Sequence, residues 1–177
     1  MIEIKKAAEV ENGRQALAET FVDGFYSWLK FISKKKEKLI NTFRHVFNLE
    51  FFYLAMIDGK AAGMVAISDG NSLVVKLNKK EFTKNLGLIK GRIVNYFLKK
   101  EFEVLGKHGM PRFPEVSFVS VLNDYRRMGI GEKMLIHAID DNPYKEYILE
   151  VVDSNTAAIK LYEKLGFKEY KRVPVKN

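Results

Sequence analysis

The stretch Val116-Ser-Phe-Val-Ser-Val-Leu-Asn-Asp-Tyr-Arg-Arg-Met-Gly-Ile-Gly131 decides the fold of this chain. Its first part, Val116 to Leu122, is rich in β-branched and apolar residues and predicts a short buried strand. The polar pair Asn123-Asp124 ends the apolar run and predicts a turn. Apolar residues recur at helical spacing after Gly131, which predicts an amphipathic helix. The stretch is therefore a strand, a turn and the glycine-marked start of a helix.

Glycines at such a junction favour the binding of an anion. Gly129 and Gly131 carry no side chain, so a ligand can approach the backbone closely. The N–H groups of the first helical turn have no partner inside the helix, and the helix dipole favours a negative charge there. We therefore expect a phosphate group at this junction, although the local pattern alone also fits glycines that serve only packing.

A second stretch, near the C-terminus, narrows this interpretation. It runs Asn155-Thr-Ala-Ala-Ile-Lys-Leu-Tyr162-Glu-Lys-Leu-Gly-Phe167. The segment Arg126-x-x-Gly-x-Gly131, preceded by a strand, resembles the acetyl-CoA-binding motif of the GNAT superfamily of N-acetyltransferases. The second stretch resembles the other signature of that family, Asn-x-x-Ala-x-x-x-Tyr followed by Gly-Phe. Both motifs occur in the family's order and at its spacing.

The resemblance implies an α/β fold: a central mixed, mostly antiparallel sheet with helices on both faces. It implies one GNAT domain over residues 1–177, with an acceptor-side half at 1–113 and an acetyl-CoA-binding half at 114–177. Apolar periodicity and turn residues predict the elements in more detail. The predicted helices cover about 8–32, 34–47, 79–106 (divided at Gly87 or Gly91), a segment after 129, and 155–165. The predicted strands cover 2–6, 51–57, 61–68, 73–77, 116–122, 147–152 and 167–173, and 106–114 is expected to be a loop.

The acetyl-CoA site implied by the resemblance is built largely from backbone. The segment from Arg126 to Gly131 would bind the pyrophosphate, with a charge added by Arg126 or Arg127. The strand from Val119 to Val121 would pair with the pantetheine arm, and an N–H there would polarise the thioester carbonyl. Asn155 would cap its helix or contact the pantetheine. The expected site residues are Val119, Ser120, Val121, Arg126, Arg127, Met128, Gly129, Ile130, Gly131, Asn155 and Tyr162, with no metal.

Two side chains are candidates for proton transfer. In the family, the tyrosine that matches Tyr162 donates a proton to the leaving thiolate. Glu115 lies eleven residues before Arg126, the offset of a catalytic glutamate in the histone-acetylating branch of the family. A carboxylate at the start of a strand suits a general base. Glu150, Asp124, His108 and a chain of water molecules are alternative bases.

Aromatic residues are concentrated in the first two predicted helices, against which the family usually builds its acceptor pocket. We expect most of them to belong to the core and one or two to line an apolar acceptor pocket. The set is Phe21, Phe25, Tyr26, Trp28, Phe31, Phe43 and Phe47.

The net charge of +8 belongs to the first part of the chain. Residues 114–177 hold ten of the 30 Lys and Arg and ten of the 22 Asp and Glu, so residues 1–113 hold the excess. If that part builds the acceptor site, an acidic acceptor or an acidic macromolecule is favoured. The alternative is that lysine-rich helix faces are simply solvated.

Composition excludes several classes of protein. The 177 residues contain no Cys, which rules out disulfides, thiolate metal sites and a cysteine nucleophile. The three His residues are far apart and show no metal-ligand spacing. No apolar run of about 18 residues predicts a membrane span, and the N-terminus lacks the layout of a signal peptide. We expect a cytoplasmic protein without a membrane partner.

The sequence thus predicts an acetyl-CoA-dependent N-acetyltransferase that transfers acetyl directly to a primary amine of a small molecule or peptide. A homodimer is compatible with this prediction. The alternative is a non-catalytic sensor that binds CoA or acyl-CoA. A nucleic-acid-binding module is disfavoured, because the basic part of the chain has no helix-turn-helix or RNA-binding aromatic motif.

Overall fold

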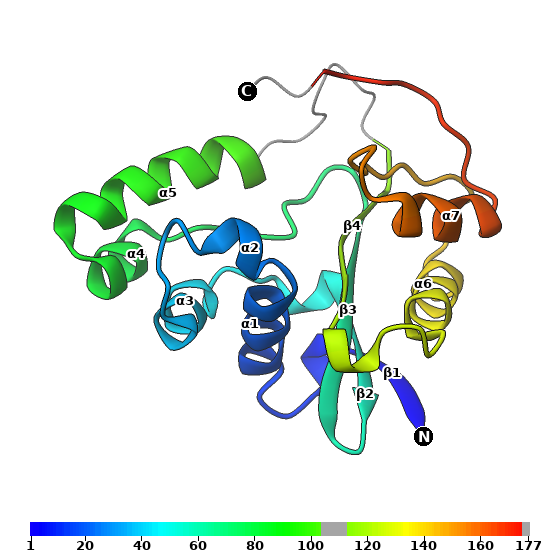
Figure 1. Ribbon diagram of the computed structural model, residues 1–177, viewed down its shortest axis with the longest axis horizontal. Helices are drawn as coiled ribbons and strands as arrows, with labels where there is room; N and C mark the ends of the chain where they lie inside the picture. The colour runs from blue at the N-terminus through cyan, green and yellow to red at the C-terminus, as the bar shows by residue number, and fades with distance from the viewer. Residues whose placement is uncertain (104–112, 175–177) are drawn as a thin grey trace.

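The computed structural model describes residues 1–103 and 113–174, in which a four-stranded sheet carries helices on both faces (Figure 1). The strand order across the sheet follows the chain, and each neighbouring pair is antiparallel. A parallel bridge between Glu115 and Ile148 adds the mixed character. The predicted α/β fold class is confirmed. The strands are β1 (Ile2–Lys6), β2 (Phe52–Ile57), β3 (Lys60–Ser68) and β4 (Glu115–Val121).

The helices divide between the two faces of the sheet. On one side lie α1 (Gly13–Gly24), α2 (Tyr26–Leu29), α3 (Lys36–Phe43), α4 (Lys79–Leu86) and α5 (Leu88–Phe102). On the other side lie α6 (Ile130–Asp140) and α7 (Thr156–Lys164) (Figure 1). Helices from residues 1–113 and from residues 114–177 therefore cover opposite faces. None of the helices in the described residues is long and apolar enough to cross a bilayer.

Two hydrophobic clusters, one on each face, explain why the central strands are almost continuously apolar. Successive residues of a strand point to opposite faces. In β2, Phe52 and Leu54 join the cluster beneath α1, whereas Tyr53 and Ala55 join the cluster beneath α6. Both faces of the sheet are thus covered by helices.

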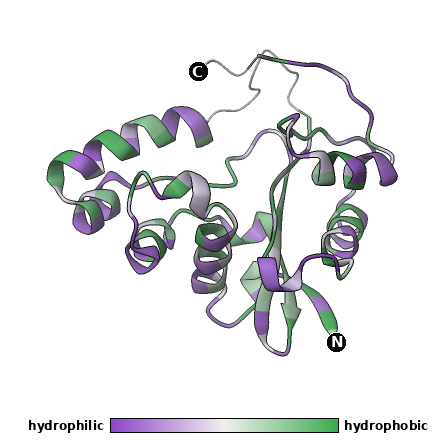
Figure 2. Ribbon diagram, in the orientation of Figure 1, coloured by the Kyte–Doolittle hydropathy of each residue, from purple (hydrophilic) through white to green (hydrophobic). Residues whose placement is uncertain are grey.

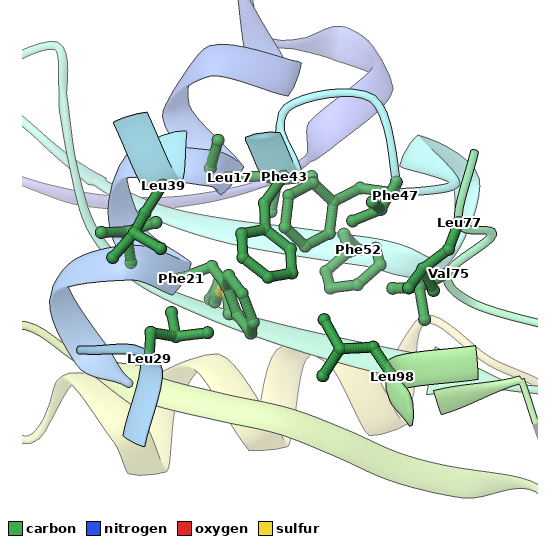
Figure 3. Close-up of a cluster of buried hydrophobic side chains, with 14 of the residues drawn as sticks. Leu17, Phe21, Leu29, Leu39, Phe43, Phe47, Phe52, Val75, Leu77 and Leu98 are labelled. Atoms are coloured by element: carbon green, nitrogen blue, oxygen red, sulfur yellow. The ribbon is translucent and has the colours of Figure 1, made fainter. Parts of the chain in front are cut away.

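Phe21 of α1 lies at the centre of the first cluster (Figure 3). Its ring centroid is 5.1 Å from that of Phe43 and 5.6 Å from that of Phe47, and Phe47 lies 5.3 Å from Phe52. The prediction that most aromatics of this region are core residues is only partly right. Phe21, Phe43 and Phe47 are buried, Phe25 and Tyr26 are half-buried, and Trp28 and Phe31 are 42% and 64% exposed.

Three of the predicted strands do not form strands. The segment 73–77 makes one bridge, between Phe47 and Val75. The segment 147–152 contributes only the bridge at Ile148. The segment 167–173 is not a strand, and most of its residues are exposed. Extended segments become strands only where a neighbouring strand pairs with them, which the apolar pattern alone cannot reveal.

The predicted helices are right in place but differ in their bounds. The first begins at Gly13 and is interrupted at Phe25, between α1 and α2. Gly87, with φ +88°, separates α4 from α5 as predicted. Gly91 does not interrupt a helix. It lies inside α5, where a Cβ would come within 2.5 Å of the Phe82 carbonyl oxygen, so it allows α5 to pack closely on α4. The expected loop at 106–114 lies mostly outside the described residues.

Candidate functional site

The middle of β4 is bent by a β-bulge. Ser117 pairs with Ala66 and Ser120 with Met64, so three steps along β4 oppose two steps along β3. Phe118, inside this interval, has a left-handed φ of +52°. Such a conformation is rare for a bulky residue and is held by its surroundings. A bulge redirects backbone groups locally and is common beside active sites.

Aromatic packing holds Phe118 in this conformation. Its ring centroid lies 6.1 Å from that of Phe21, 5.7 Å from that of Phe52 and 5.7 Å from that of Phe102. The side chain is thereby fixed in the first cluster, beneath α1. The bend in β4 is therefore built into the core of the protein.

The outer edge of β4 is largely open to an extended ligand. At its start, the Val116 N–H donates to the Ile148 carbonyl at 2.8 Å, and the Ile148 N–H donates to the Pro114 carbonyl at 2.9 Å. Beyond that bridge, no strand in the described part of the chain pairs with this edge. The Leu122 N–H faces β3, where it donates to the Ala62 carbonyl. The carbonyl of Val121 belongs to the same peptide group and points the opposite way, to the outer edge. An extended chain could pair here as an additional strand.

The turn after β4 brings two left-handed residues to the start of α6. Arg127 has φ +63° and Gly129 has φ +75°. No side chain caps α6, so the N–H groups of its first turn face outward without a capping partner. Ile130 is buried and anchors the helix start in the second cluster. The junction has the geometry that holds a phosphate group.

Arg126 connects this helix start to the strand edge. Its Nε donates to the Val121 carbonyl at 3.1 Å, across five residues of the turn. The sequence predicted only a charge for this side chain, and the structure adds a bond that satisfies the last carbonyl of the open edge. Arg126, Arg127 and Met128 are exposed, so two cationic groups stand beside the uncapped helix.

Close packing brings α1, α6 and α7 to the same strand. A Cβ on Gly131 would lie 3.6 Å from Val121 Cγ2 and 3.3 Å from Leu161 Cδ2. A Cβ on Gly24 would lie 2.0 Å from the Oγ of Ser120, so the end of α1 can touch β4 only because residue 24 is glycine. Sequence reasoning missed Gly24, although a glycine inside the helix predicted at about 8–32 is a signal of close packing or of a helix end.

Tyr162 is buried in the second cluster, with 8% of its surface exposed. Its ring centroid lies 6.0 Å from that of Phe167. Burial raises the pKa of the Tyr162 phenol above its usual value. The hydroxyl therefore stays protonated over the physiological range, as a proton donor must.

Asn155 is the N-cap of α7. Its Oδ1 accepts a hydrogen bond from the Ala158 N–H at 3.3 Å, so the predicted capping role is confirmed. The same helix is joined to the first turn of α6 by an ion pair between Lys164 and Glu132, with a distance of 2.7 Å. This pair spans 32 residues, and nothing in the local sequence indicated it.

The candidate bases lie in different environments. Glu115 is half-buried at the first residue of β4, three residues before the bulge. Glu150 and Asp124 are exposed. His108 lies outside the described residues. Across residues 1–103 and 113–174, no group of three or more His, Cys, Asp or Glu could hold a metal ion.

Known proteins resemble this chain in sequence and in fold. The family model described as the acetyltransferase (GNAT) family matches residues 15–167. An N-alpha-acetyltransferase of Sulfurisphaera tokodaii is 35% identical over 96 residues, covering 47% of this chain and 54% of that protein. The [ribosomal protein bS18]-alanine N-acetyltransferase of Escherichia coli K12 is 46% identical over 54 residues, covering 29% and 36%.

These matches span about half or less of the length of the curated relatives. The similarity to solved structures extends over almost the whole chain. An N-acetyltransferase from Staphylococcus aureus Mu50 superimposes with a TM-score of 0.66 at 14% identity, covering 98% of this chain and 94% of that one. At this identity the likeness establishes the fold.

Proposed function

Because the chain belongs to the acetyltransferase (GNAT) family, we propose that it transfers an acetyl group from acetyl-CoA directly to a primary amine. The observation that carries this proposal is the bulge at Phe118, placed on an open strand edge beside the uncapped start of α6. The edge suits an extended arm, and the helix start suits a phosphate group. One ligand that contains both parts is acetyl-CoA.

Each part of the junction has a role in binding. The N–H groups from Met128 to Gly131 would hold the pyrophosphate, with Arg126 and Arg127 adding charge. The backbone of Val119 to Val121 would pair with the pantetheine arm. An N–H redirected by the bulge would donate to the thioester oxygen as negative charge develops on it, which is the work of an oxyanion hole.

Tyr162 would complete the transfer as a general acid. The amine nitrogen forms a bond to the carbonyl carbon while the carbon–sulfur bond breaks, and the sulfur takes the proton of the Tyr162 hydroxyl. The amine loses its proton to a base or to water. That proton then passes to the Tyr162 phenolate and restores the hydroxyl. The burial that raises the pKa of Tyr162 keeps this proton available at neutral pH.

Glu115 remains the first candidate for the base, because it is half-buried at the start of the strand that carries the bulge. Glu150, Asp124 and water are the alternatives. The kind of amine that accepts the acetyl group determines how strong this base must be. An α-amino group has a pKa of about 8 and a lysine side chain about 10.4, so an α-amine needs less help to lose its proton.

Among amine acceptors we favour the N-terminal amine of a peptide. Support comes from the relatives, which are named for N-alpha acetylation and for acetylation of an alanine of a ribosomal protein. A cytoplasmic location and a homodimer remain predictions.

Thiol release from acetyl-CoA tests the proposal. A short peptide with a free N-terminal alanine should release thiol and gain one acetyl group, whereas the same peptide with a blocked N-terminus should do neither. A lysine side chain as the only amine should react more slowly. If acetyl-CoA binds but neither these peptides nor a panel of small amines accepts acetyl, the chain is a sensor that binds acyl-CoA without turnover.

A further inference from the structure

Helix α5 has a second apolar face that no other element of residues 1–103 and 113–174 covers. Gly91, Val94 and Leu98 are buried against the body of the protein. Ile89 and Phe97, offset from them around the helix, are 79% and 64% exposed. Figure 2 shows hydrophobic and hydrophilic bands alternating along this peripheral helix. An amphipathic surface helix ordinarily has one apolar stripe, facing the core.

The exposed apolar side chains are contiguous and surround an open hollow. It has a volume of about 670 Å³ and lies between α5 and the segment after α2. Tyr96 and Trp28 extend the surface, because the Tyr96 ring lies 5.6 Å from Phe97 and the Trp28 ring 5.7 Å from Phe31. Contiguous apolar surface of this kind marks an interaction site. The hollow is lined by Phe31, Ile89, Lys90, Ile93, Val94, Phe97 and Leu98.

The stretch of chain that carries this surface is rich in cations. From Lys84 to Glu103 the chain carries five Lys or Arg and two Glu. Of the two carboxylates, Glu103 is turned inward, where it accepts from the Leu77 N–H and pairs with Lys99. Lys100 lies over the Tyr96 ring at 4.4 Å. The cations besides Lys99 are Lys84, Lys90, Arg92 and Lys100.

This charge pattern indicates which kind of partner the surface binds. A second copy of the chain would place cations against cations, which disfavours self-association through this face. An anionic surface complements it. Exposed aliphatic and aromatic side chains flanked by Lys and Arg are the composition of helices that lie in the interface of an anionic bilayer. Lys90 lines the hollow, and its side chain is long enough for the ammonium group to reach a headgroup.

We propose that α5 and the segment around Phe31 dock on the surface of membranes that contain anionic phospholipid. Acyl chains contact Ile89, Ile93 and Phe97, and phosphate headgroups pair with the surrounding cations. Such docking needs no helix that spans the bilayer. It therefore departs from our sequence-based expectation of no membrane partner, which rested on the absence of a spanning segment.

Trp28 gives the test a built-in reporter, because it is the one Trp of the chain and borders the hollow through Phe31. The protein should sediment with vesicles of equal parts phosphatidylcholine and phosphatidylglycerol, and its Trp fluorescence should shift to shorter wavelength. Pure phosphatidylcholine vesicles should bind far less, and added salt should weaken binding to the anionic vesicles.

Substitutions locate the surface. Ile89→Glu with Phe97→Glu should weaken vesicle binding about tenfold or more. Ile136→Glu, on the exposed side of α6, is the matched control and should bind as the wild type does.

Lys90→Gln with Arg92→Gln should lower the affinity for anionic vesicles about fivefold per residue. Lys60→Gln with Lys133→Gln, two exposed lysines elsewhere, should lose much less. Thermal unfolding of each variant checks that it is folded.

Three results would overturn the proposal. The first is no binding to anionic vesicles by the folded wild type. The second is binding that the Ile89→Glu, Phe97→Glu variant retains or that leaves Trp28 fluorescence unchanged. The third is a concentration-dependent dimer, seen in sedimentation without lipid, that the same double variant abolishes, because the face would then be an interface between two copies.

Discussion

At the scale of single residues, backbone conformation builds the candidate site. Phe118, Arg127 and Gly129 all have positive φ, and they lie within twelve residues that include the strand edge and the helix start. Only glycine adopts this conformation without strain. The bulk of Phe118 is accommodated because its ring is packed among other aromatics, whereas Gly129 has open space around it.

A pair of glycine variants separates strain from binding. Gly129 and Gly59 have φ of +75° and +76°, and a Cβ on either would meet nothing within 4 Å. Gly129→Val and Gly59→Val should therefore each lose about 1–2 kcal/mol of unfolding free energy. Only Gly129→Val should also weaken acetyl-CoA binding, by about tenfold, as measured by calorimetry. Equal affinity in both variants would remove Gly129 from the binding site.

Replacing one hydroxyl tests the proton donor. Tyr162→Phe should lower kcat about 100-fold while the KM for acetyl-CoA stays within about twofold, because only the departure of the thiolate needs the proton. Tyr147→Phe is the control. It is another tyrosine of the second cluster whose pKa is raised by burial, but its hydroxyl donates to the Ile139 carbonyl at 3.1 Å. A kcat for Tyr162→Phe equal to that of the control would contradict the assignment.

At the scale of elements, α4 and α5 form a closely packed helical pair attached to α3. Gly91 lets the backbones of α4 and α5 approach, and His45, just after α3, accepts a hydrogen bond from the Asn78 N–H at 2.9 Å, at the start of α4. These contacts hold α5 in place, and with it the apolar surface described above.

Replacing Gly91, inside α5, should lower the stability of the protein for steric reasons. A Cβ at Gly91 would lie 2.5 Å from backbone atoms of Phe82 and Thr83, so Gly91→Ala should lose about 1–3 kcal/mol of unfolding free energy. This loss is what remains after the gain of about 1 kcal/mol in helix propensity. Gly131→Ala meets side-chain ends rather than backbone, Leu161 at 3.3 Å and Val121 at 3.6 Å, and should be better tolerated. Chemical denaturation of both variants measures the difference, and equal stabilities would refute the packing argument.

His45 should make stability fall at acidic pH. Burial lowers the pKa of His45. The positive charge of Arg14 lowers it as well, and the negative charge of Glu81 partly opposes the two. The unfolded chain then takes up a proton near pH 6.5 that the folded chain does not, so the unfolding free energy should decrease as pH falls from 7 to 5. His45→Gln should reduce this decrease. Identical slopes in the wild type and His45→Gln would exclude His45 as the cause.

At the scale of the whole molecule, the sequence predicted the helices and strands whose positions depend on local residue patterns. The strand at Glu115–Val121 and the helix from Ile130 were placed correctly, because an apolar run, a turn and helical periodicity follow one another directly. The bulge at Phe118 depends on register against β3, so its own residue type carries no signal. The segments 147–152 and 167–173 are extended in pattern, and only the presence or absence of a partner decides whether such a segment becomes a strand.

The central claim is that the junction of β4 and α6 binds acetyl-CoA. Calorimetric titration of acetyl-CoA into the wild-type protein, with dephospho-CoA as a comparison, tests it most directly. We predict saturable binding at one site with micromolar affinity. The absence of binding at millimolar acetyl-CoA would contradict the account, because the open strand edge and the uncapped helix would then be features of the fold alone.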